Sequence, residues 1–106
     1  MQLAPVLHWA HYGRRYSGTC LEAFWSDYGL SVTPDPIRPG YLWSVYRTRT
    51  DGVRAADGTP LRDWNRDRVA SGRVDGHYRL WKGQEVSSEI FARNEAAAAF
   101  YDLVTR

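Results

Sequence analysis

The sequence has almost no cysteine and no long apolar run, and each shortage excludes a class of protein. Cys20 is the only cysteine in 106 residues, so no disulfide can form within the chain and a reducing compartment fits. No apolar run approaches the ~20 residues that a membrane-spanning helix needs. The first residues also lack the basic and long apolar regions of a secretion signal. We therefore expect a cytoplasmic protein with no membrane segment.

A strong charge of one sign is also lacking. The formal net charge is +2, far below the basic bias of a dedicated nucleic-acid binder. The sequence is 43% apolar and 25% charged, as in an ordinary globular protein, so wholesale disorder is not expected. Its length matches one domain of common size. We expect a single domain over residues 1–106.

No set of residues has the spacing of a metal or catalytic site. The histidines and the cysteine are scattered and lack the paired spacing of a structural zinc site; they are His8, His11, Cys20 and His77. No glycine-rich loop has phosphate-binding spacing. Asp63 and Asp67 alternate with arginines, which is typical of a solvated ion-pair surface. We therefore expect no metal, no cofactor and no enzymatic activity. A thiol enzyme acting through Cys20 is the remote alternative, because a helix start would activate that thiol.

The clearest local pattern is a strand-turn-strand-helix unit over residues 75–105. Residues 77–81 are aromatic-rich, Lys82-Gly83 is a turn dipeptide, and residues 84–92 resume alternation. Asn94 then offers a helix cap before an alanine-rich segment.

In that alanine-rich segment we expect a helix over residues 95–103 whose main core anchor is Phe100. The short connections elsewhere exclude crossover helices, so the sheet on which this helix packs should be antiparallel.

The first 30 residues predict one further helix. Thr19 and Glu22 have the spacing of a capping box, apolar residues follow at helical spacing, and Gly29 suits a C-terminal cap. We therefore predict a short amphipathic helix over residues 20–28. Residues 1–16 fit either a strand or a helix, with a strand over 6–12 preferred for its aromatic and branched side chains.

The middle of the chain is predicted to be a connector followed by strands. Residues 33–40 hold three prolines and should form a stiff connector between an N-terminal layer and the sheet. Residues 41–48 alternate as a strand, a short strand fits 53–56, and residues 60–68 show no clean period. The expected fold is thus α+β: a small antiparallel sheet of about three to five strands, with the C-terminal helix and the short N-terminal helix packed on it.

Aromatic and arginine residues are abundant. Five Trp and seven Tyr exceed what a small core readily buries, and thirteen of the fourteen basic residues are arginine. The simpler explanation of the arginines is a GC-rich genome, whose codons favour Arg, Ala and Gly, and selection for guanidinium chemistry is the alternative. Residues of these types on the expected strands are the candidate partner-binding residues, namely Tyr41, Trp43, Arg47, Arg49, Arg79 and Trp81.

Three interpretations of these aromatic residues and arginines remain open. Trp, Tyr and Arg dominate protein–protein hot spots, so the leading hypothesis is a non-catalytic protein-binding module. Such a module suits an inhibitor or adaptor, for instance an anti-CRISPR-like protein of a phage or mobile element, although no motif in the sequence supports the anti-CRISPR example. The expected partner is a protein, and a nucleoprotein complex is one form that it could take. The alternative is a single-stranded DNA or RNA binder that stacks bases on an aromatic and arginine sheet face. In the third, the aromatics form only core and the arginines cover its rim.

Overall fold

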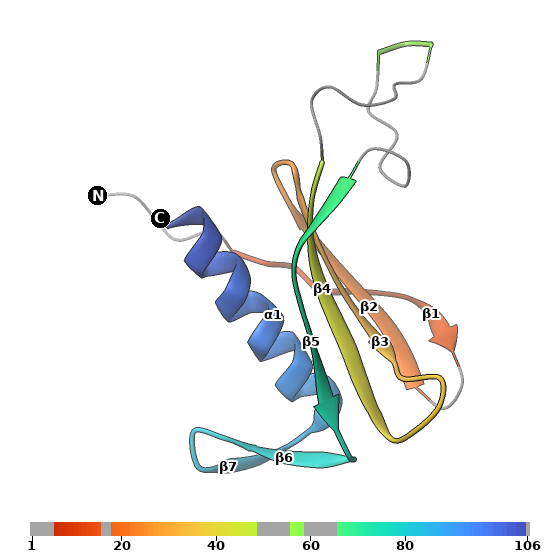
Figure 1. Cartoon of the computed structure of the whole chain (residues 1–106), viewed down its shortest axis with the longest axis vertical. Coiled ribbons are helices and arrows are strands. Elements are labelled where there is room, and N and C mark those ends of the chain that lie inside the picture. The colour runs from red at the N-terminus through yellow and green to blue at the C-terminus, as the bar shows by residue number, and fades with distance from the viewer. Residues whose placement is uncertain (1–5, 16–17, 49–55, 59–65, 106) are drawn as a thin grey trace.

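One antiparallel sheet dominates the structure. A computed structural model of the protein describes residues 6–15, 18–48, 56–58 and 66–105 (Figure 1). Consecutive strands are neighbours in the sheet, in the order β1-β2-β3-β4-β5, and each pair is antiparallel. The strands are β1 (Ala10–Arg15), β2 (Gly18–Trp25), β3 (Tyr28–Pro34), β4 (Gly40–Thr48) and β5 (Arg66–Asp75).

A hairpin and a helix complete the described chain. β6 (Tyr78–Trp81) and β7 (Gln84–Ser87) form a separate two-stranded hairpin, and α1 (Ser88–Val104) follows directly. Lys82 and Gly83 in the hairpin turn have φ of 51° and 83°, the left-handed geometry that matches the twist of paired strands. Figure 1 shows this hairpin at the N-terminal end of α1, at the same end of the molecule as the β3–β4 turn. No helix of the described residues is both long and apolar enough to cross a membrane.

The core lies between one face of the sheet and α1. Inward side chains alternate along the strands, and α1 places Ala92, Ala96 and Phe100 against them at four-residue spacing. Phe100 is fully buried, and its ring meets Trp25 and Tyr28 edge-on at centroid distances of 5.7 and 5.6 Å. The alanines allow close approach of the helix to the sheet. The prediction that Phe100 anchors the C-terminal helix is confirmed.

The short N-terminal helix predicted over residues 20–28 is wrong. Those residues belong to β2 and β3, which are joined by a turn at Ser26 and Asp27. The supposed capping residues are paired in the sheet instead: Thr19 opposite Arg14, and Glu22 opposite Ser31. Nine residues are too few to separate a helical from a strand period, and aromatic side chains pack well on a pleated surface between two neighbouring strands.

The helix begins earlier than Asn94. Ser87 is its N-cap, because the Ser87 hydroxyl accepts a hydrogen bond from the Ile90 backbone N–H at 3.3 Å. The alternation expected over 84–92 therefore ends at Ser87. The pattern was ambiguous because Ser88 and Ala92 fit both a period of two and the four-residue spacing of a helix face.

The predictions for the remaining strands and for the proline-rich connector agree with the structure only in part. The strand predicted over 41–48 is confirmed as β4, but β3 runs to Pro34, so the proline-rich connector joins two neighbouring strands of one sheet rather than two layers. β1 begins at Ala10 rather than near residue 6. β5 was not predicted, because residues 60–68 show no alternation of apolar and polar residues and the dipeptide Ser71-Gly72 is typical of a turn. The strand expected at 53–56 lies outside the described residues except for Ala56, which is in a turn.

Candidate functional site

A groove lies at the end of the molecule where three segments meet: the β3–β4 turn, the β5–β6 turn and the first turn of α1. Its volume is about 740 Å³. We call it the end groove, and its walls are residues 34–41, 76–78 and 87–89, together with Gly18. The short connections at this end of the sheet bring these segments together.

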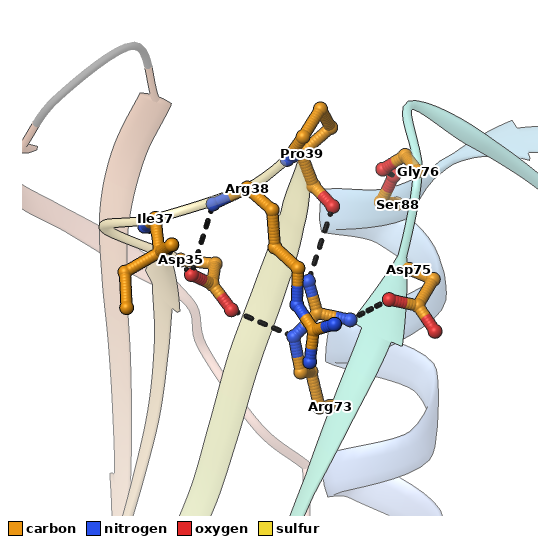
Figure 2. Close-up of polar contacts among 8 residues, drawn as sticks. All are labelled: Asp35, Ile37, Arg38, Pro39, Arg73, Asp75, Gly76 and Ser88. Carbon is orange, nitrogen blue, oxygen red and sulfur yellow. Dashed lines mark hydrogen bonds and ion pairs between the residues drawn. The ribbon is translucent and has the colours of Figure 1, made fainter.

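The β3–β4 wall is held by a carboxylate and a guanidinium group (Figure 2). The Asp35 carboxylate accepts hydrogen bonds from the backbone N–H groups of Ile37 at 2.8 Å and Arg38 at 3.3 Å. Arg73 of β5 donates from Nε to the same carboxylate at 2.6 Å and from Nη2 to the Pro39 carbonyl at 3.2 Å. Arg73 also forms an ion pair with Asp75. The turn is therefore fixed to the neighbouring strand as well as stiffened by its prolines.

The hydrogen bonds between Asp35, Arg73 and the β3–β4 turn, which we call the clamp, favour the ionised form of the Asp35 carboxyl group. The Ile37 N–H bond, followed by the Arg73 bond, lowers the pKa of Asp35 from 3.8 to about 2. Asp35 is thus ionised at neutral pH, with the charge that its partners require.

The two other walls are tied to the first. The Gly76 N–H donates to the Pro39 carbonyl at 3.0 Å, which joins the β5–β6 turn to the β3–β4 turn. The Ser88 backbone N–H donates to the His77 carbonyl at 2.9 Å, and the Ser88 hydroxyl donates to the Gly76 carbonyl. The start of α1 is thereby joined to the β5–β6 turn.

Large apolar side chains are displayed at this end. Ile37 is 90% exposed, Tyr78 67% and Leu80 68%. Ile37 and Tyr78 line the end groove, and Leu80 lies two residues beyond Tyr78 on the same face of β6. We call these three side chains the apolar rim. Contiguous exposed apolar patches mark interaction sites, whereas apolar side chains exposed singly are common on any protein surface.

The other face of β6 packs on the helix. Trp81 meets the Phe91 ring edge-on at 5.3 Å, and the Arg79 guanidinium group lies 5.7 Å from the centroid of the same ring. These contacts fix the hairpin against α1 and leave Tyr78 and Leu80 facing outward.

The structure does not gather the predicted partner-binding residues on one surface. Tyr41 lines the end groove, and Arg79 and Trp81 lie on the nearby hairpin. Trp43 points toward α1, where its Nε1–H donates to the Glu95 carboxylate at 2.8 Å. Arg47 lies near the far end of β4, where it pairs with Asp27 at 3.3 Å. Arg49 lies outside the described residues.

The sequence reasoning missed all three residues of the apolar rim. Ile37 carried a usable signal, because an isoleucine between prolines in a turn has no strand or helix face with which to bury itself. Tyr78 and Leu80 alternate with Arg79 and Trp81, and alternation alone does not tell which row faces the helix.

The described residues include the four that were considered for metal binding or thiol chemistry, namely His8, His11, Cys20 and His77. No group of three or more His, Cys, Asp or Glu side chains in that part of the chain is placed to hold a metal ion. Cys20 lies within β2 rather than at a helix start, and it is only 1% exposed. The activation on which the thiol-enzyme alternative depended is therefore missing.

Comparison with known proteins finds no matching family model, no matching curated protein and no matching solved structure.

Proposed function

We propose that this chain is a non-catalytic protein-binding module of the cytoplasm that holds its partner through the apolar rim. The observation that carries the proposal is the display of Ile37, Tyr78 and Leu80 on a scaffold fixed by hydrogen bonds and an ion pair. The single cysteine, free and buried, is compatible with a reducing compartment.

The surroundings of the rim favour a protein over a polyanion. Exposed charges of both signs lie on the hairpin and the β3–β4 turn, including Arg38, Lys82 and Glu85. An apolar centre with a mixed polar border is the usual anatomy of a protein interface. The partner surface that complements it offers apolar side chains at its centre and charges of both signs at its edge.

Size and stiffness also suit this function. A standard interface buries about 800 Å² on each partner, about one ninth of this protein's 7269 Å² of surface. Because the β3–β4 turn is already ordered by Asp35 and Arg73, binding would cost little additional conformational entropy. The same surface serves an inhibitor, such as an anti-CRISPR-like protein, or an adaptor, and the identity of the partner decides between these roles.

The experiment compares how tightly the partner binds two variants of this protein. Tyr78→Ser with Leu80→Ser removes most of the rim, whereas Val6→Ser removes an equally exposed side chain, 67%, outside the end groove. Immobilised protein is used to capture a partner from a host extract, and the purified partner is then titrated. We expect the double variant to weaken binding at least about 30-fold, as loss of a hot spot of about 2 kcal/mol does, and Val6→Ser to bind normally.

Two results would overturn the proposal. One is a partner whose affinity is the same for the double variant and for the unaltered protein. The other is binding of a mixed-sequence single-stranded oligonucleotide that weakens steeply with salt, which the nucleic-acid alternative predicts. Thermal unfolding of each variant checks that the fold is intact.

A further inference from the structure

The sheet face opposite α1 carries a second groove, of about 690 Å³. Its floor is a row of four residues that face one another across four strands. The register pairs Glu22 of β2 with Ser31 of β3, Ser31 with Ser44 of β4, and Ser44 with Ser71 of β5. Three small side chains in a row lower the middle of the sheet surface, and we call the result the open-face groove.

The polar side chains of this floor have no protein partner among the described residues. Ser44 is only 9% exposed, and its hydroxyl makes no hydrogen bond with any other described residue. The same holds for the hydroxyls of Ser31 and Ser71 and for the Glu22 carboxylate. A buried hydroxyl is normally paired, so an unpaired one that lines a groove indicates a position for a ligand's polar group.

Aromatic and apolar side chains flank the serine row. Tyr46 and Arg68, paired across β4 and β5, lie on one side, and Leu42 lies on the other. The Arg68 guanidinium group donates to the Tyr46 hydroxyl at 3.3 Å and lies 5.6 Å from its ring centroid, which orients the ring. Tyr12 of β1, 44% exposed, also lines the groove.

The charges in the groove nearly cancel. Glu22 and Arg68 have opposite signs, and Arg73 is already paired with Asp35 and Asp75. A phosphate backbone needs a track of unpaired cations, and the described lining does not provide one. The complementary ligand is therefore neutral, with many groups that both donate and accept hydrogen bonds.

We propose that the open-face groove binds a neutral oligosaccharide. Sugar hydroxyls match the serine hydroxyls and the Glu22 carboxylate in donors and acceptors. The C–H groups on one face of a pyranose ring carry partial positive charge and pack on the negative face of a tyrosine ring. The strand surface of another small antiparallel fold, the OB-fold, binds oligosaccharides as well as oligonucleotides. This site lies on the opposite side of the sheet from α1 and is independent of the apolar rim.

The test uses matched six-unit probes on the intact protein. Cellohexaose, maltohexaose and hexa-N-acetylchitohexaose, all neutral, are each titrated at up to millimolar concentration, with a thymidine hexanucleotide as the polyanionic probe, and amide shifts are followed by NMR. We expect saturable shifts at the open-face residues of β2 to β5 with at least one sugar and none with the oligonucleotide.

Two variants alter the floor of the open-face groove, and a third variant, altered elsewhere, serves as a control. Ser44→Ala removes the hydroxyl and adds no bulk to the floor, and we expect binding to weaken about fivefold; Glu22→Gln keeps the size but removes the charge, and we expect about tenfold. The Tyr78→Ser/Leu80→Ser protein should bind the sugar unchanged. The proposal is overturned if no sugar shifts these amides, if both floor variants bind as tightly as the unaltered protein, or if the oligonucleotide occupies the groove.

Discussion

Replacing Trp43 tests whether this side chain binds a partner, as the sequence indicates, or holds the sheet to α1, as the structure indicates. The sequence made Trp43 a partner-binding residue, whereas the structure points it toward α1 and gives it the Glu95 carboxylate as a hydrogen-bond acceptor at 2.8 Å. Gly72 of β5 makes room for the indole, because a Cβ at that position would lie 2.6 Å from the ring. Trp43 therefore connects β4, β5 and α1, and its loss should affect folding rather than binding.

The magnitude follows from these contacts. Truncating a buried Trp to Ala typically costs about 3–5 kcal/mol, and because Trp43 is half-buried we expect the low end, about 3 kcal/mol. This is a large share of the ~5–15 kcal/mol that stabilises a domain. Trp43→Phe keeps most of the packing but leaves Glu95 without its donor, and a hydrogen bond to a charged group contributes about 1.5–3 kcal/mol.

Urea unfolding followed by far-ultraviolet circular dichroism measures both variants. A double-mutant cycle of Trp43→Phe with Glu95→Gln isolates the coupling between the two side chains. If Trp43→Ala leaves the unfolding midpoint unchanged but abolishes partner binding, then the indole faces the partner and our account of the core is wrong.

Three further predictions concern burial and charge. Phe100→Ala should lower the free energy of unfolding by about 3–5 kcal/mol, measured by urea unfolding, because the ring is fully buried; a loss under about 1 kcal/mol would contradict this packing. The pKa of Asp35 is about 2 in the folded protein against 3.8, so the unfolded chain binds the proton more readily, and the stability that Asp35 contributes should be lost as pH falls from about 4 to 2. As pH falls over that range, the thermal midpoint should decrease less steeply for Asp35→Asn than for the unaltered protein. Equal slopes would show that the ionised Asp35 carboxylate does not stabilise the fold. Cys20, 1% exposed, should react slowly with a thiol reagent until urea unfolds the protein, and immediate labelling would show that β2 is not packed as described.

Several elements were determined by local sequence. The alternation of β4, the Lys82-Gly83 turn and the alanine-rich helix with Phe100 each depend on neighbouring residues that agree with one another. Turn geometry, strand alternation and helix propensity act over a few residues, so they can be predicted from the local sequence without knowledge of the rest of the chain.

Other features needed the neighbouring strands. Residues 20–28 fit a helix until β3 pairs with β2, and the helix start stayed ambiguous because Ser88 and Ala92 suit two periods. The candidate sites depend still more on tertiary structure. Ile37 and Tyr78 are 41 positions apart in the sequence, and the serine row takes one residue from each of three strands. Sequence spacing therefore determined which residues could form strands, turns and a helix, whereas strand register and the docking of α1 decided which faces were buried, because both depend on contacts between residues distant in the chain.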